Sequence, residues 1–430
     1  MTLSTQPYKG ARDFYPEDKA IQKYMFQILA STVESFGYEE YDAPILEPLE
    51  IYTAKTSDEI VAQQTYTFTD RGDRQVVIRP EMTPSVSRMV AAKRHQLTYP
   101  LRWYSIPNLW RYERPQRGRY REHWQLNVDL FGEQSLVAEQ EMIVLADQIF
   151  KNFGADHSMY QIRLNSRLLM DLITKDYLGL SPDRSTKLIK LIDKRSKLEA
   201  SDFAAQALDI VKTQEVADKL ETVLNLKSID GLAKPLKSSP AAVELGTLIS
   251  SLSNELGIEN VVYDPSLARG FDYYSDVVFE IFDNHPDNNR SMMGGGRYDG
   301  LVGLYGVDPV PTIGFGLGDA TLLNFLQLHD LLPQISSRSD LAVLLLGDVN
   351  LAAHKLIAQL RGQGLNVVVD FSQRKLGQKI KWAETKGLRF VLVIGEKELK
   401  SEQLNIKDLT NGQEDTIKLD DIYAFLKSQK

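Results

Sequence analysis

The sequence contains no cysteine, which excludes disulfide bonds, thiolate zinc sites, iron–sulfur clusters and cysteine nucleophiles. Histidine is scarce as well: the 430 residues include 6 histidines, and no two stand at a metal-ligand spacing such as HxxxH or HxH. Any metal ion is therefore expected to be a hard cation with oxygen ligands. The chain also lacks a run of about 18 apolar residues, and its start lacks the pattern of a secretory signal. We expect a cytoplasmic protein that has no contact with a membrane.

A strong excess of positive charge is missing too. Lys and Arg total 50 against 58 for Asp and Glu, a net charge of -8, which argues against nonspecific coating of nucleic acid. Hydrophobic residues make up 43% and charged residues 25%, as in ordinary globular proteins. The length predicts two or three domains.

The first 80 or so residues carry a helix and a hairpin. Apolar residues recur at three- and four-residue spacing over 17–36, between Pro16 and Gly37, which predicts an amphipathic helix. Residues 38–46 contain Pro44, which cannot donate a ladder hydrogen bond, so this segment is expected to be an edge or dimer-interface strand. The stretches 65–70 and 74–79 flank a turn and predict a β-hairpin.

A longer hairpin is predicted from arms at 101–113 and 121–132. The second arm alternates strictly between two kinds of side chain. The apolar set is Trp124, Leu126, Val128 and Leu130, and the polar set is Gln125, Asn127 and Asp129. The polar face of this strand is expected to meet water or to line a site.

The secondary-structure pattern of the remaining chain changes twice. Residues 165–255 read as helical, strand patterns return at 261–263 and 274–282, and glycine-studded runs at 294–296 and 314–318 lead into a Leu-rich helix. A linker is expected over 326–339. Beyond it, apolar strands alternate with helices, as in a small α/β domain with a parallel sheet. The predicted fold class is an α+β domain with an antiparallel sheet, a helical insertion and a C-terminal α/β domain.

The densest chemical feature is an arginine-rich hairpin tip between residues 111 and 121. Its arginines alternate with tyrosines, which indicates either a solvated tip or a site for polyphosphate or RNA. Arg111 and Glu113 share a parity and could meet the polar face of the second arm. The segments 79–83 and 267–274 could add further charged groups, or only structural salt bridges. Neither glycine run has the pattern of a phosphate-binding loop.

These residues carry a resemblance to a known family. The run YERPQRGRYR resembles motif 2 of the histidyl-tRNA synthetases, which are class II aminoacyl-tRNA synthetases. LARGFDYY and GGGRYDGLV resemble the two histidine-specific segments of that family, and the helix leading to APILEP resembles its dimer-forming motif 1. KGARDFYP and the terminal α/β domain fit the same family, so the resemblance covers essentially the whole chain.

The resemblance implies a role for each matching residue. Arg111 would hold the ATP α-phosphate, Glu113 the adenine end, and Arg269 the charge that develops on the α-phosphate. Arg111 and Arg269 would be the catalytic residues, and Arg119 and Arg121 would also bind ATP. The acceptor end of tRNA would contact Arg114 and Gln116. The implied histidine-binding residues are Glu81, Thr83 and Gln125 at the amino group, Asp129 and Tyr274 at the imidazole, with Tyr273, Tyr298 and Arg269.

The implied function is that of a histidine–tRNA ligase. Histidine would react with ATP to give histidyl-adenylate, which would then esterify the terminal adenosine of tRNA(His), with Mg²⁺ bound through the ATP phosphates. A homodimer is expected. The implied domains are a catalytic domain in two parts, 1–165 and 256–330, a helical insertion at 166–255 and an anticodon-binding domain at 339–430.

Two positions depart from the family pattern. Asp129 stands where the imidazole-binding acid is commonly Glu, and Ala320 and Thr321 stand where motif 3 commonly has Glu-Arg, whose Arg contacts the ATP tail. The hairpin arginines, Arg117 among them, are expected to compensate. The motif 3 loss favours the alternative of a synthetase-like regulatory protein that senses histidine without aminoacylation. A plain RNA-binding protein is a third interpretation, against which the net charge weighs.

Overall fold

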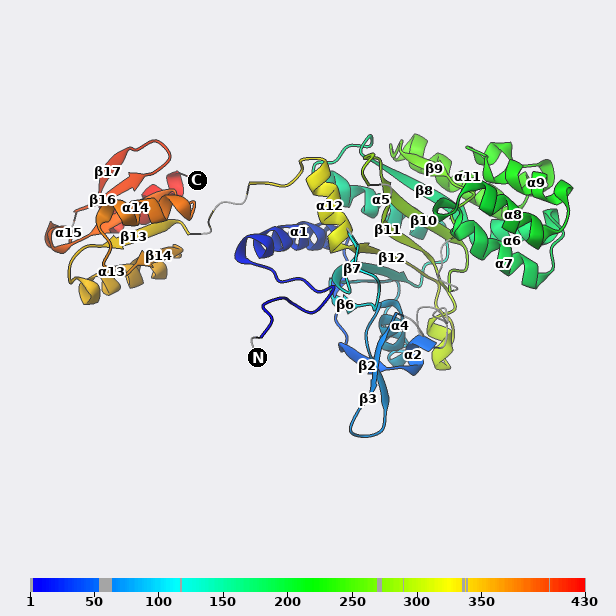
Figure 1. Ribbon diagram of the computed structural model, residues 1–430, viewed down its shortest axis with the longest axis horizontal. Coiled ribbons are helices and arrows are strands. Elements are labelled where there is room, and N and C mark those ends of the chain that lie inside the picture. The colour runs from blue at the N-terminus through cyan, green and yellow to red at the C-terminus, as the bar shows by residue number, and fades with distance from the viewer. Residues whose placement is uncertain are drawn as a thin grey trace. The chain divides into compact units, whose positions relative to one another are not determined.

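The computed structural model describes residues 3–53, 64–116, 118–268, 273–288, 290–334, 337, 339–401 and 403–429. The chain forms two compact units, Met1–Leu332 and Pro333–Lys430 (Figure 1). In the described part of the chain, no helix has the length and apolar character needed to cross a lipid bilayer.

The first unit is built on a large sheet, of which nine strands lie in the described residues. They are β1 (Glu39–Glu40), β5 (Leu101–Ser105), β6 (Asn108–Trp110), β7 (Glu122–Phe131), β8 (Tyr160–Ser166), β9 (Val261–Tyr263), β10 (Val277–Asp283), β11 (Ser291–Arg297) and β12 (Thr312–Gly318). Their order is β1-β5-β7-β12-β11-β10-β8-β9, with β6 paired to β7. The inner pairs are antiparallel, as predicted, whereas the outermost pairs, β1 with β5 and β8 with β9, are parallel.

The two faces of this sheet differ because β7 alternates as predicted. Leu126, Val128 and Leu130 are buried in the main apolar core. That core also takes in side chains of α1 (Pro16–Ser35), α5 (Val137–Asn152) and α12 (Asp319–Leu328). The opposite face carries Gln125 and Asp129, so the sheet is a platform with an apolar underside and a polar floor.

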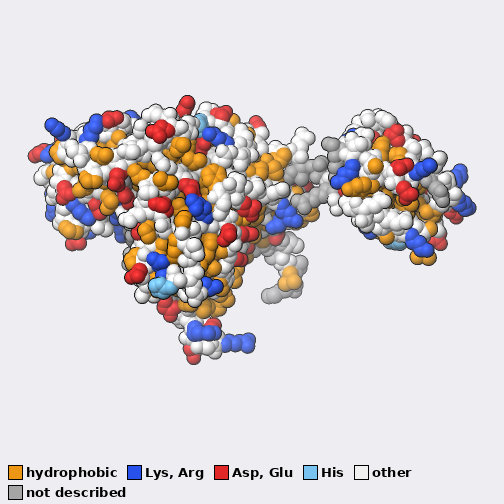
Figure 2. Space-filling model, turned by 180° about the vertical axis from the view of Figure 1, so that it is seen from behind, with side chains coloured by type: hydrophobic (Ala, Val, Ile, Leu, Met, Phe, Trp, Pro, Cys, Tyr) orange, Lys and Arg blue, Asp and Glu red, His pale blue; other side chains and the backbone are white. Residues whose placement is uncertain are grey.

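A small sheet projects from this platform. Its strands are β2 (Leu46–Pro48), β4 (Gln75–Ile78) and β3 (Tyr66–Thr69), and the predicted hairpin of β3 and β4 is confirmed. The hairpin protrudes in Figure 1, and Figure 2 shows basic side chains at its tip. The short helices α2 (Glu50–Thr53) and α4 (Thr83–Ala92) pack beside it, where the Tyr52 hydroxyl lies 3.2 Å from the Glu81 carbonyl oxygen.

Three local predictions were wrong in extent. The edge strand expected over 38–46 is reduced to the two residues of β1. The arm expected over 101–113 is broken into β5 and β6 at 106–107, where Pro107 lacks a donor for the ladder. The linker expected from residue 326 begins later, because α12 continues to Leu328.

A helical segment follows β8, a strand that was not predicted. Its helices are α6 (Arg167–Asp171), the π-helix η1 (Leu172–Tyr177), α7 (Pro182–Asp193), η2 (Arg195–Lys197), α8 (Ala200–Val211), α9 (Gln214–Leu224), η3 (Ile229–Gly231), α10 (Lys234–Lys237), α11 (Pro240–Ser250) and η4 (Ser251–Glu255). The short η5 (Val302–Tyr305) lies between β11 and β12. Leu188, Leu220 and Leu245 of the helical segment belong to the same apolar core as the sheet, so the segment is packed against it rather than tethered to it.

The second unit is an α/β domain with a five-stranded sheet among its described residues, ordered β14-β13-β15-β16-β17. Its elements are β13 (Leu341–Leu345), α13 (Asn350–Gly362), β14 (Val367–Asp370), α14 (Leu376–Thr385), β15 (Phe390–Ile394), α15 (Glu396–Ser401), β16 (Gln403–Asp408), β17 (Glu414–Lys418), η6 (Leu419–Asp421) and α16 (Ile422–Ser428). The parallel part, β14-β13-β15, agrees with the prediction. The prediction of a wholly parallel sheet was wrong, because β16 and β17 pair antiparallel. β16 buries mainly alternate residues, such as Leu404 and Ile406.

Candidate functional site

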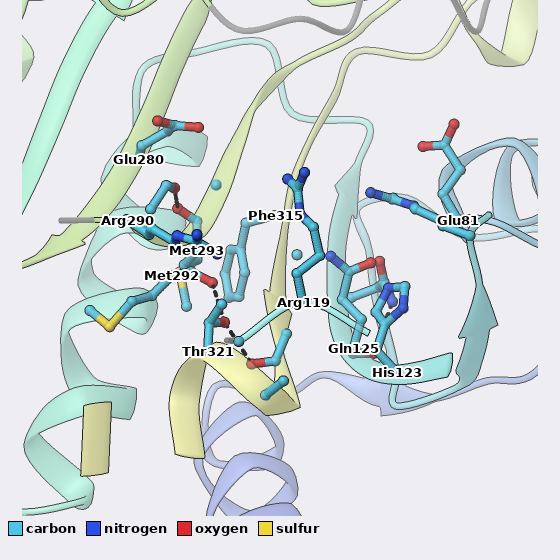
Figure 3. Close-up of a pocket in the computed structure, with 18 of the residues that line it drawn as sticks. Glu81, Arg119, His123, Gln125, Glu280, Arg290, Met292, Met293, Phe315 and Thr321 are labelled. Carbon is cyan, nitrogen blue, oxygen red and sulfur yellow. Dashed lines mark hydrogen bonds between the residues drawn. The ribbon is translucent and has the colours of Figure 1, made fainter. Parts of the chain in front are cut away.

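A cavity of about 880 Å³ opens on the polar face of the large sheet. Side chains and glycines of β7, β11 and β12 line it, together with the arginine-rich hairpin and residues of α12 (Figure 3). The structure thus brings together residues from three distant parts of the chain. The predicted site residues that line it are Glu81, Thr83, Arg111, Glu113, Gln116, Arg119, Gln125, Asp129, Tyr273, Tyr274 and Tyr298.

Two predicted residues whose positions are described are not among those that line this cavity. Arg114 and Arg121 line a separate pocket of about 410 Å³ beside Lys9 and Gly10. The Arg121 guanidinium lies 4.0 Å from the centre of the Tyr112 ring and donates a hydrogen bond of 3.1 Å to the Glu113 carbonyl oxygen. The expectation that Arg121 binds ATP is therefore not supported by its placement. Arg269 lies outside the described residues, as does Arg117.

The hairpin presents two arginines to the cavity in different ways. Arg111 is held from both ends: its main-chain N–H donates to the Arg121 carbonyl oxygen at 2.8 Å, and its Nε donates to the Pro80 carbonyl oxygen at 2.9 Å. Arg119 sits at the tip, where it forms an ion pair of 2.9 Å with Glu113 and its side chain remains 57% exposed. Arg111 is thus a positioned cation, whereas Arg119 has freedom to move.

Asp129 is one of the deeply buried acids of the cavity, with Glu81 and Asp319. One of its oxygens, Oδ1, accepts a short hydrogen bond from the Tyr298 hydroxyl, and the Tyr41 hydroxyl also interacts with the carboxylate. Burial raises the pKa of Asp129 to about 7, although the hydrogen bond from Tyr298 opposes the change. Burial and the neighbouring carboxylate also raise the pKa of Tyr298 well above its usual value. Asp129 lines the cavity, and a carboxyl group of this kind can accept a hydrogen bond from a ligand.

Glycine keeps the space above this acid open. A Cβ atom at Gly314 would collide with the Asp129 carboxylate and lie 2.8 Å from the Tyr298 hydroxyl. A Cβ atom at Gly316 would lie 2.5 Å from Nε2 of Gln125. The glycine run of β12 therefore allows polar side chains of β7 to lie across the strand, which is a packing role rather than a phosphate-binding one.

Aromatic rings form one wall of the pocket. The Tyr273 ring lies 5.0 Å from that of Tyr274 and 5.7 Å from that of Tyr298, measured between ring centres. The Tyr273 hydroxyl donates to Oε2 of Glu81 at 3.3 Å. Such a wall, with acids at both ends, suits a flat ring that carries N–H groups and a positively charged amino group.

Two further residues of the site were missed from the sequence. His123 lines the cavity, and its parity in β7 matches that of Gln125, so the alternation could have found it. Burial, followed by the charges of Arg111, Arg12 and Arg119, lowers the pKa of His123 to about 3, which keeps the ring neutral. Arg290 also lines the cavity and comes from the turn before β11; no local pattern pointed to it.

The N-terminal segment fastens the arginine-rich hairpin from outside the cavity. Arg12 forms an ion pair of 2.7 Å with Asp319, and its guanidinium lies 4.2 Å from the centre of the Tyr120 ring. Asp319 in turn accepts a hydrogen bond from the Trp124 main-chain N–H at 3.1 Å. The KGARDFYP segment thus connects the hairpin to the start of α12.

No group of three or more His, Asp or Glu side chains that could hold a metal ion occurs in the described ranges. Single carboxylates do line the cavity, among them Glu113 and Glu280. Such a set suits Mg²⁺, which commonly keeps its waters and uses one or two carboxylates together with substrate phosphates.

Comparison with known proteins gives a consistent picture. The model of the histidyl-tRNA synthetase family matches residues 10–322, and the model of the anticodon-binding domain matches residues 340–429. The histidine–tRNA ligase of Leptospira biflexa is 41% identical over 432 residues, covering 99% of this chain and 98% of the relative. That of Thermoplasma volcanium is 35% identical over 430 residues, covering 99% of each. The crystal structure of histidyl-tRNA synthetase from Nostoc sp. PCC 7120 is similar with a TM-score of 0.83 at 22% identity, covering 100% of both chains.

Proposed function

The chain belongs to the histidyl-tRNA synthetase family, and we propose that the cavity on its large sheet is where histidine reacts with ATP. The protein is an aminoacyl-tRNA ligase that joins histidine to tRNA. The observation that carries the proposed site is the buried Asp129, which lines the cavity beside Tyr298 and the aromatic wall.

The regulatory alternative is disfavoured. Relatives named histidine–tRNA ligase align over 98% or more of their own length, so the anticodon-binding unit is included in the similarity. The motif 3 substitutions at 320–321 are therefore a departure within an active family and do not by themselves indicate a regulatory protein.

Histidine would lie across the Asp129 end of the cavity. An imidazole N–H would donate to the Asp129 carboxylate, and the aromatic rings of Tyr273 and Tyr274 would contact the ring. The amino group would meet Glu81, with Thr83 and Gln125 close by. An amino acid without the imidazole N–H would leave the buried carboxylate without this donor, which is the basis of discrimination.

ATP would lie under the hairpin. Arg111 would bind the α-phosphate, because its guanidinium is held in place, and Glu113 would contact the adenine end. Mg²⁺ would bind through the ATP phosphates, with carboxylates such as Glu280 or Glu113 within the same cavity. When bound, the ion would neutralise the negative charge of the departing pyrophosphate.

The reaction would need no nucleophile from the protein. A carboxylate oxygen of histidine forms a bond to the α-phosphorus while the bond to the bridging oxygen of pyrophosphate breaks, and histidyl-adenylate remains. A terminal ribose hydroxyl of tRNA then attacks the carbonyl carbon and releases AMP. Arg111 would stabilise the charge on the α-phosphate, a role the resemblance also gives to Arg269. Arg114 and Gln116 would contact the acceptor end.

The decisive experiment is histidine-dependent exchange of pyrophosphate into ATP, followed by charging of tRNA(His). Exchange with histidine, and not with other amino acids, is expected. Absence of exchange would exclude the cavity as an activation site.

The histidine affinity should depend on pH through Asp129. The ionised carboxylate accepts the imidazole N–H more strongly than the neutral acid does, and burial raises the pKa of Asp129 to about 7. As the pH falls below about 7, a growing fraction of Asp129 is protonated, so the KM for histidine is expected to rise. The Asp129→Asn variant has no ionisable group at this position, so its KM for histidine should change with pH only through the ionisation of free histidine. A ratio of the two KM values that stays constant between about pH 6 and 8 would contradict the assignment.

We also propose the domain assignment predicted from the sequence, with Pro333–Lys430 reading the anticodon. A chain ending at Leu332 keeps every described residue of the cavity. It is expected to retain pyrophosphate exchange within about threefold but to lose tenfold or more in tRNA charging, the equivalent of about 1.4 kcal/mol. Circular dichroism would verify folding, and unimpaired charging would refute this division of labour.

A homodimer and a cytoplasmic location belong to the same proposal. Ile45, Leu46 and Phe68 are 45% exposed or more on the small sheet, an apolar surface suited to a second copy of the chain. The substrates ATP and tRNA support a cytoplasmic location.

A further inference from the structure

At the start of α12, the side chains at positions 320 and 321 bring no positive charge to the cavity. The Thr321 hydroxyl lies 2.9 Å from the Gly318 carbonyl oxygen and 3.2 Å from that of Met292, so its one proton is used by the main chain (Figure 3). Ala320 has no polar group. Neither side chain brings a positive charge, yet the triphosphate of ATP carries up to four negative charges that need cations or Mg²⁺.

The described cations that line the cavity are Arg111, Arg119, Lys197 and Arg290. Arg111 is held at Pro80, toward the end of the cavity proposed for the α-phosphate. Arg119 is paired with Glu113, and Lys197 comes from the exposed end of the helical segment. Arg290 lies on the side of the cavity that carries Thr321 (Figure 3).

Arg290 is close in sequence to a main-chain group that Thr321 contacts. Arg290 immediately precedes β11. The Thr321 hydroxyl donates a hydrogen bond to the carbonyl oxygen of Met292, the second residue of that strand. Nη2 of Arg290 donates a hydrogen bond of 2.9 Å to Oε1 of Gln116, whose main chain is hydrogen-bonded to that of Arg119. Figure 3 shows Arg290 beside Met292 on the Thr321 side, with Gln125 and Glu81 on the other.

We propose that Arg290 binds the β- and γ-phosphates of ATP and so supplies the positive charge that positions 320–321 lack. The proposal rests on the proposed function of the cavity. A guanidinium presents its N–H donors in a planar fork that matches phosphate oxygens.

The test compares Arg290→Ala with the wild-type enzyme in histidine-dependent pyrophosphate exchange and in calorimetric titrations with ATP and with AMP. We expect the KM and the Kd for ATP to rise about tenfold or more, with the KM for histidine changed less than twofold. The Kd for AMP should be unchanged, because AMP lacks the phosphates assigned to Arg290. Arg290→Lys should recover part of the ATP affinity, and Arg184→Ala, an exposed arginine of α7, should behave as wild type.

Other outcomes would overturn the proposal. Equal weakening of ATP and AMP would show that Arg290 only orders the hairpin, whose residues Arg111 and Glu113 would hold the part common to both ligands. An unchanged ATP affinity would show that Arg290 has no contact with the nucleotide. A second variant adds Thr321→Arg to Arg290→Ala, and recovery of ATP affinity there is the expected result. If the wild-type enzyme showed no histidine-dependent exchange, the proposed function itself would be refuted. This outcome distinguishes failure of the proposed function from failure of the role proposed for Arg290.

Discussion

Replacing Arg111 with alanine is expected to lower the rate of histidine-dependent pyrophosphate exchange by about 10²-fold or more, the scale seen when one preorganised donor is removed from a developing charge. Its guanidinium is fixed by the Pro80 carbonyl oxygen, and its main chain by Arg121. A donor that is already in position before the reaction begins needs no reorganisation free energy as charge builds on the α-phosphate.

The measurement is single-turnover formation of histidyl-adenylate at saturating ATP and histidine, which separates the chemical step from binding. Arg111→Lys keeps the charge but not the planar fork and should recover only part of the rate. Arg71→Ala, in the exposed turn of the β3–β4 hairpin, is the matched control and should leave the rate unchanged. A rate for Arg111→Ala within about threefold of wild type would remove this residue from the chemical step.

Asp129→Ala is expected to weaken histidine binding by about 1–3 kcal/mol, or roughly 5- to 150-fold, the cost of leaving a buried polar group without its partner. ATP binding should change little, because the carboxylate lies on the floor of the cavity below Gly314 and Tyr298, remote from the hairpin. Discrimination against other amino acids should weaken in parallel.

Calorimetric titration with histidine and with ATP tests this ordering directly. Tyr298→Phe keeps the ring but removes the hydroxyl that donates to Asp129, so a smaller loss of histidine affinity is expected. If ATP affinity fell more than histidine affinity in Asp129→Ala, the imidazole would have to bind elsewhere.

Much of the platform could be predicted from the sequence because the information is local. The alternation along β7 determines which side chains face the core and which face the cavity, since successive residues of a strand point to opposite faces. The β3–β4 hairpin and the strand–helix alternation from β13 to β15 follow from the same kind of short-range pattern. The motifs of residues 111–121 and 294–301 then connected this platform to a family.

The antiparallel edge of the second unit and the strand β8 could not be predicted in this way. β8 is the partner of β10 and β9, which lie about 100 residues away in the chain, and β16 pairs with β15 only because the folded sheet leaves that edge open. Which strand pairs with which depends on contacts that no local pattern contains.

The residues of the site divide along the same line. By itself, the sequence determined the polar floor of β7 and the arginine-rich hairpin. Only the tertiary structure decided that Arg119 enters the cavity while Arg121, of the same parity, leaves it. The reason is that Arg119 exchanges main-chain hydrogen bonds with Gln116 at the hairpin tip, whereas the main-chain N–H of Arg121 is bonded to Gly10 and its side chain stacks on Tyr112. The burial that raises the pKa of Asp129 and the approach of Arg290 to Gln116, 174 residues away, likewise exist only once the strands have assembled.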